Sequence, residues 1–188
     1  MRTFIAINLD QEIKRSLSQF VGELKARSPE RRGIRWVRPE GMHLTLKFLG
    51  EIDEEKIPRI ESILKRISEK FEPFPLKIKG TGSFPPKSKT PRVLWVAIEE
   101  VEGLMRLQSN MEEKMESLGF PKERRTFHPH LTLGRVKSFS DIKETLDFFE
   151  KNKDKNFGEM EAKKITFFRS VLKPTGAEYS VLSEFELK

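Results

Sequence analysis

A four-residue segment occurs twice in this chain of 188 residues, and it constrains the fold more than any other feature of the sequence. His43–Leu46 (HLTL) returns letter for letter as His130–Leu133, 87 positions later. Self-similarity within a chain indicates that one structural unit is used twice. We therefore predict two related lobes, approximately residues 1–90 and 91–188, with the Gly- and Pro-rich stretch 80–91 as the seam between these halves.

The surroundings of both copies predict the same order of elements, namely strand, helix, HLTL strand, helix and further strands. Strand-like sequence lies at residues 4–7, 77–79, 94–98, 164–168 and 178–185. Apolar residues recur at helical spacing over 13–24, 53–71, 104–118 and 140–149, with Pro58 placing the start of the second helix near Ile57 and Ser140 as the N-cap of the last. Each half alone is small and two-layered, so we expect one domain over 1–188, with helices outside and a pseudo-two-fold axis that sets the HLTL strands facing each other.

Composition narrows the classes of function. The chain has 36 Lys and Arg against 29 Asp and Glu, and a net charge of +7 favours polyanionic partners such as RNA. The lack of cysteine excludes a disulfide framework, a thiolate nucleophile and a cysteine-ligated metal site, and it fits a cytoplasmic setting. No apolar run approaches the roughly 20 residues of a membrane span, and the amino terminus does not have the pattern of a signal peptide.

The HLTL segment has two different faces if it forms a strand. Side chains alternate, so His43 and Thr45 share one face, as do His130 and Thr132, while the leucines point into the core. Two imidazoles can divide the base and acid roles of one reaction near neutral pH, and two hydroxyls can donate hydrogen bonds to an anion. We predict that the four side chains line one shared groove.

Cleavage of a phosphate ester suits this set of groups. In-line displacement at phosphorus needs a base on the attacking oxygen, an acid on the leaving oxygen and donors to the non-bridging oxygens. The sequence shows no Asp and His cluster at metal-ligand spacing, so we expect neither a metal nor another cofactor. The predicted activity is metal-independent cleavage of a phosphodiester.

The sequence resembles the 2H phosphoesterase superfamily, and within it the RNA 2′,3′-cyclic phosphodiesterase family, also called 2′-5′ RNA ligase. The resemblance covers the whole chain. The segments typical of the family are RWVRPEGMHLTLKFLG at 35–50, FHPHLTLGR at 127–135, RTFIAI at 2–7 and RVLW at 92–95. The resemblance implies an α+β fold of two lobes, each an antiparallel sheet with helices on its outer face, and an active-site cleft between them.

The resemblance also implies an activity, the opening of a terminal 2′,3′-cyclic phosphate on RNA to a 2′-phosphate. By motif position, His43 resembles the proton donor to the departing 3′ oxygen, and His130 resembles the proton acceptor that activates water. Thr45 and Thr132 would hold the phosphate. The pseudo-symmetry of the motifs leaves the direction of proton transfer open. The expected partner is RNA with a cyclic phosphate end, including tRNA fragments, bound by a monomer away from membranes.

Four more residues are candidate substrate contacts or structural residues. Arg135 is either a phosphate contact, if the strand bends just before it, or a solvated strand end. His128 either orients the site by a hydrogen bond or is a turn residue. Trp36 and Phe48 can stack on bases. For Phe48 we favour core packing, because 15 Phe against one Tyr indicate aromatic residues used for burial.

Two arginine pairs, Arg31-Arg32 and Arg124-Arg125, each precede a motif. They are either residues at the rim of the cleft that bind the RNA backbone or plain solvated turns.

Three alternatives to hydrolysis of RNA ends remain. The same site can join RNA ends through a 2′-5′ linkage, it can hydrolyse a small cyclic phosphate, or the chain can bind RNA ends without catalysis.

Overall fold

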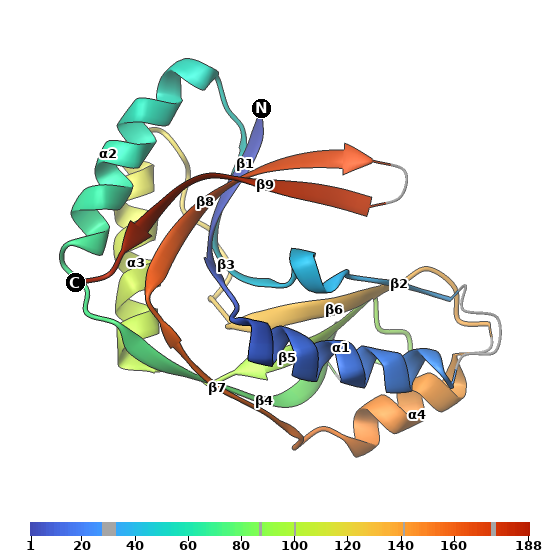
Figure 1. Ribbon diagram of the computed structural model, residues 1–188. Helices are drawn as coiled ribbons and strands as arrows, with labels where there is room; N and C mark the ends of the chain where they lie inside the picture. Colours follow the sequence, from blue (N-terminus) through green and yellow to red (C-terminus); the bar gives the residue numbers. More distant parts are fainter. Residues whose placement is uncertain (28–32, 87, 100, 141, 174–175) are drawn as a thin grey trace.

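Two antiparallel sheets form the centre of the protein (Figure 1). The computed structural model describes residues 1–27, 33–86, 88–99, 101–140, 142–173 and 176–188. Sheet A has the strand order β3 (His43–Glu51), β1 (Arg2–Asn8), β8 (Lys164–Lys173) and β9 (Gly176–Glu186). Sheet B has the strand order β2 (Ile34–Trp36), β6 (His130–Val136), β5 (Val93–Ile98), β4 (Phe74–Phe84) and β7 (Asn156–Ala162).

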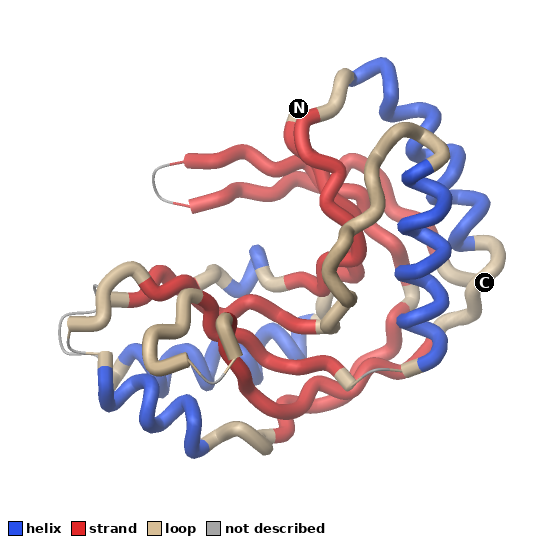
Figure 2. The backbone as a smooth tube through the Cα atoms, turned by 180° about the vertical axis from the view of Figure 1, so that it is seen from behind, coloured by secondary structure: helices blue, strands red, loops and turns tan. Residues whose placement is uncertain are grey.

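The helices cover the outer sides of the two sheets (Figure 2). Within the described residues the α-helices are α1 (Gln11–Lys25), α2 (Ile57–Ser68), α3 (Glu102–Glu116) and α4 (Lys143–Lys151), with short 3-10 turns η1 (Pro39–Gly41) and η2 (Glu54–Lys56). Helices α2 and α3 pack on sheet A, and α1 and α4 pack on sheet B. None of these helices is long and apolar enough to cross a membrane. The two-lobed α+β fold with outer helices is as predicted.

The two sequence halves exchange elements between the lobes. Helix α1 follows β1 of sheet A but packs against β7 of sheet B, whereas α3 follows β5 of sheet B but packs against β3 of sheet A. In the same way β4 joins sheet B and β8 joins sheet A. Each lobe is therefore built from strands of both halves, so the lobes of the structure are not the predicted segments 1–90 and 91–188.

Two helices begin at local signals in the sequence. Helix α1 begins after Asp10, whose carboxylate accepts a hydrogen bond from the backbone N–H of Ile13 at 2.8 Å. Helix α2 begins at Ile57, as Pro58 predicts. The prediction of Ser140 as the N-cap of α4 is wrong, because this helix begins only after Ile142, whose side chain is buried in the core.

The predicted seam at 80–91 also differs from the structure. Strand β4 continues through Phe84, so the first part of this glycine-rich stretch belongs to sheet B. Gly82 lies there against the indole of Trp95, where a larger residue would collide with the ring. The glycine thus serves close approach of a strand to a large side chain rather than a link between domains.

Candidate active site

Both HLTL copies form the first residues of a strand. His43 begins β3 and His130 begins β6, and these two strands lie in contact at the junction of the lobes. The histidines and threonines of both copies are half-buried on the inner face of their sheet, whereas all four leucines are buried beneath the helices. The alternation predicted from the sequence is present, and it turns both histidines toward the space between the sheets.

Each motif strand has a bulge at the last leucine of its motif. The register of β1 with β3 skips Leu46, and the register of β5 with β6 skips Leu133. One extra residue reverses the alternation of side chains beyond it. Phe48 and Arg135, two positions after the bulge, therefore lie on the same face as the histidines. From the sequence, Arg135 is expected to face the histidines only if the strand bends just before it. The bulge at Leu133 gives this orientation instead of a bend.

The bulge overturns one prediction about aromatic residues. The expectation that Phe48 packs in the core is wrong, because 64% of its surface is exposed, next to Phe4 on the inner face of sheet A. Trp36 lies on the face of sheet B opposite to the histidines, because it pairs with Gly134 and packs against the hydrophobic core. The structure thus places Phe48 on the same face of sheet A as His43, and it places Trp36 on the helix-covered face of sheet B.

The arginine pairs fall in different parts of the chain. Arg31-Arg32 lies outside the described residues. Arg124-Arg125 is exposed in the segment that joins α3 to β6, a few residues before His130. Arg135 is exposed on the inner face of sheet B.

A backbone carbonyl orients His130. Its Nδ1 lies 2.7 Å from the carbonyl oxygen of His128, and because a carbonyl only accepts hydrogen bonds, Nδ1 carries the proton. The other ring nitrogen, Nε2, is then the free acceptor of the neutral imidazole. Phe84 meets the ring edge-on at 5.3 Å, and Trp95 lies at 6.1 Å between ring centroids. His128 contributes through its backbone, while its own side chain is exposed.

His43 has the corresponding partner two residues before it, a backbone hydrogen bond with Gly41. Burial lowers the pKa of His43 from 6.5 to about 4, the charge of Lys14 contributes to this lowering, and the bond to Gly41 partly opposes both. Lys14 is held nearby, since its Nζ donates to Asn8 Oδ1 at 2.9 Å and Asn8 pairs with His43 across β1 and β3. Before a substrate binds, His43 is therefore neutral at pH 7.

Aromatic rings from three strands surround His43. Phe4 stacks on the imidazole at 4.6 Å, Phe168 lies at 5.7 Å, and Tyr179 meets it edge-on at 5.1 Å between ring centroids. The HLTL motif does not predict these contacts or the contact with Lys14, because these residues lie on strands and a helix remote from the motif in the sequence. The alternation of β1 is the one local signal, since it places Phe4 on the same face as Asn8.

The site therefore holds two imidazoles in equivalent positions of the repeat, two hydroxyls beside them, and cationic and aromatic side chains near them. Among the residues that the structure describes, no three His, Asp or Glu side chains gather closely enough to hold a metal ion. Such a site can move two protons at one phosphate and bind the anion through hydroxyl donors.

Known proteins resemble the chain along its whole length. It is 40% identical over 185 residues to an RNA 2′,3′-cyclic phosphodiesterase of Methanocaldococcus jannaschii, covering 98% of this chain and 100% of that protein. It is 38% identical over 186 residues to an RNA 2′,3′-cyclic phosphodiesterase of Archaeoglobus fulgidus, covering 99% of this chain and 100% of that protein.

Solved structures share the fold. A protein of Thermus thermophilus superposes with a TM-score of 0.82 at 33% identity, over 100% of this chain and 98% of that one. LigT of Escherichia coli, complexed with 3′-AMP, superposes with a TM-score of 0.78 at 26% identity, over 99% and 97% of the two chains. The family model of LigT-like phosphoesterases matches twice, at residues 7–95 and 96–179, which reproduces the internal repeat. This chain belongs to the LigT-like phosphoesterase family.

Proposed function

We propose that this protein hydrolyses the 2′,3′-cyclic phosphate at the end of an RNA to a 2′-phosphomonoester. The observation that carries the proposal is the mirrored pair His43 and His130, each with a backbone hydrogen-bond partner two residues before it and each on the inner face of a contacting strand. The names of the relatives in Methanocaldococcus and Archaeoglobus support the same substrate.

In the proposed reaction, His130 is the general base. Its Nε2 takes a proton from water as the water oxygen attacks phosphorus, and the bond between phosphorus and the 3′ oxygen breaks. His43 gives its proton to that departing oxygen. Thr45 and Thr132 donate hydrogen bonds to the non-bridging oxygens, and Arg135 adds positive charge at the edge of the site. The two imidazoles supply both proton transfers, so we propose that no metal and no cofactor takes part.

The acid role requires His43 to be protonated, although its pKa is about 4 before a substrate binds. A negative charge about 4 Å away is worth about 4 kcal/mol at an effective dielectric constant near 20, or about three pKa units. A bound phosphodiester therefore offsets the effect of burial. We propose that His43 takes up its proton when the substrate binds.

The test is incubation of an oligonucleotide ending in a 2′,3′-cyclic phosphate with the protein in excess chelator. We expect a product with a 2′-phosphate, and we expect His130→Ala to lose more than about tenfold in kcat/KM. The matched control is His128→Gln, which removes an imidazole but keeps the carbonyl that orients His130. A 3′-phosphate product, or a His130→Ala variant within tenfold of the parent, would contradict the mechanism.

We also propose a setting for this activity. A site completed by one chain supports a monomer, and the net charge of +7 supports RNA fragments, such as pieces of tRNA, as substrates. The cysteine-free sequence supports work in the cytoplasm.

A further inference from the structure

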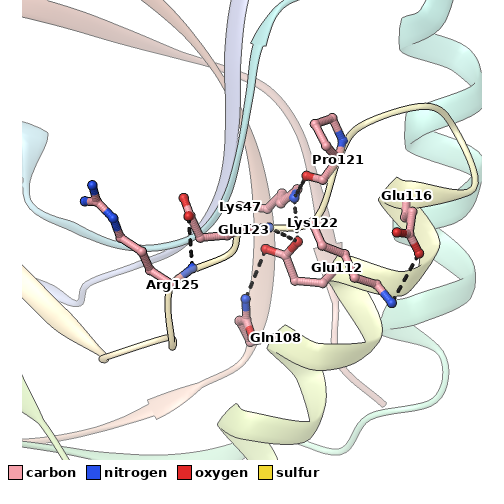
Figure 3. A network of polar contacts seen from close by, with 8 residues as sticks. All are labelled: Lys47, Gln108, Glu112, Glu116, Pro121, Lys122, Glu123 and Arg125. Atoms are coloured by element: carbon pink, nitrogen blue, oxygen red, sulfur yellow. Dashed lines mark hydrogen bonds and ion pairs between the residues drawn. The ribbon is translucent and has the colours of Figure 1, made fainter.

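A buried polar network ties the segment between α3 and β6 to sheet A and its helix α3 (Figure 3). Lys47 of β3 forms an ion pair with Glu112 of α3, and its Nζ also donates to the carbonyl oxygen of Pro121 at 2.6 Å. The side chains of Lys47 and Glu112 are only 4% and 11% exposed. Gln108 donates to the second carboxylate oxygen of Glu112 at 3.2 Å, so the network joins a strand, a helix and a connecting segment.

The same network continues to the exposed arginine pair. The backbone N–H of Glu123 donates to Glu112 Oε2 at 3.1 Å, and the Glu123 carboxylate accepts from the backbone N–H of Arg125 at 3.1 Å. In Figure 3 the Arg125 side chain extends away from α3, on the far side of Glu123. The position of Arg125 is thus set, through two hydrogen bonds, by a carboxylate buried beneath the segment.

The repeated fold does not require this network. The position equivalent to Lys47 in the second motif strand is Gly134, which has no side chain. Burying two charges costs several kcal/mol of desolvation, and apolar residues of similar size often stabilise a protein equally well. The bulge at Leu46 turns Lys47 toward the helix-covered core, and the sequence places a charge at this buried position only in the first half.

We propose that Lys47 and Glu112 are positioning residues that anchor the segment 121–125. The anchor holds Arg124 and Arg125 in the exposed segment that leads into His130, where they bind backbone phosphates of the RNA beyond the reacting end. A segment that is already held in place loses less conformational entropy on binding than a free segment does. This inference rests on the proposed function and adds to it a preference for polymeric RNA over a cyclic mononucleotide.

Two kinds of variant test the anchor. The double variant K47M/E112L removes both charges together, so that neither is left buried and unpaired. The exposed variant E123A releases the Arg125 N–H and leaves the buried pair intact, while E123Q removes the same charge but keeps an oxygen that accepts this hydrogen bond. K164M is the matched control for removal of a lysine, because Lys164 pairs with Glu184 and Glu186 on the surface of sheet A.

Each variant is assayed on 2′,3′-cyclic AMP and on an oligonucleotide with a cyclic phosphate end, over a series of salt concentrations. We expect K47M/E112L and E123A to raise KM for the oligonucleotide at least fivefold and to leave kcat/KM for cyclic AMP within about twofold. The slope of log affinity against log salt should shrink by about 0.7 for each RNA phosphate that the variant no longer neutralises. E123Q and K164M should behave as the parent protein does.

Equal losses on both substrates, or an unchanged salt slope in K47M/E112L and E123A, would overturn the anchor. A parent protein that turns over neither substrate is a failure of the proposed function instead. In that case the anisotropy of the labelled oligonucleotide still measures RNA affinity and its salt slope for every variant. The same differences between E123A and E123Q then support or overturn the anchor without catalysis.

Discussion

The low pKa of His43 predicts how folding stability depends on pH. The group has a pKa of about 4 in the folded protein and 6.5 when unfolded, so the unfolded chain binds more protons between these values. Stability from the neutral imidazole is therefore fully present above pH 6.5, and it is lost as the pH falls toward 4. The shift predicts a loss of about 2 kcal/mol between pH 7 and pH 5 and about 3 kcal/mol in full, at 1.36 kcal/mol for each pKa unit.

His43→Gln isolates this contribution, since it removes the titrating group and leaves every other ionisable side chain in place. Urea unfolding of the parent and the variant at constant ionic strength, at pH 7, 6 and 5, gives the free energy of unfolding of each. We expect the parent to lose about 2 kcal/mol more than His43→Gln over this range. His128→Gln, which removes an exposed imidazole, is the matched control.

The predicted pH dependence is refuted if the free energies of unfolding of the parent and His43→Gln differ by the same amount, within about 0.5 kcal/mol, from pH 7 to pH 5. Such a result means that the folded protein accepts a proton on His43 as easily as the unfolded chain does. A difference that grows in the other direction would mean that a nearby negative charge outweighs both burial and Lys14.

Further predictions concern phosphate binding, catalysis, RNA affinity and the packing of sheet B. Inorganic phosphate binding at pH 5.5 should be accompanied by proton uptake that His43→Gln lacks, measured by calorimetry in buffers of different ionisation enthalpy. Thr132→Ala should lower kcat/KM by about tenfold to a hundredfold in steady-state assays, whereas Thr132→Ser should retain most activity. Phe48→Ala should weaken oligonucleotide affinity about threefold or more without changing the urea midpoint, because the ring is exposed. Gly82→Ala should destabilise the fold by about 1 to 3 kcal/mol by displacing Trp95, seen in urea unfolding followed by tryptophan fluorescence.

The family and the two-lobed fold were accessible from sequence because their signals are local and repeated. The HLTL copies, the strand alternation and the helical spacing each depend on a few neighbouring residues. The start of α2 at Ile57 follows from Pro58 in the same way. The failed prediction of Ser140 as a cap shows the limit, since α4 begins only after Ile142, which is buried in the core and has no capping side chain.

The sequence by itself determined that His43 and His130 stand in equivalent places on the inner face of two strands. Only the tertiary structure decided what surrounds them. A bulge in each motif strand places Phe48 and Arg135 on the same face as the histidines, because register depends on the partner strand as well as on the strand itself. The pKa of His43 depends on burial and on Lys14, which are set by elements remote in the sequence. Alternation is a property of one strand, whereas register, desolvation and the exchange of elements between lobes arise only when segments from both halves pack together.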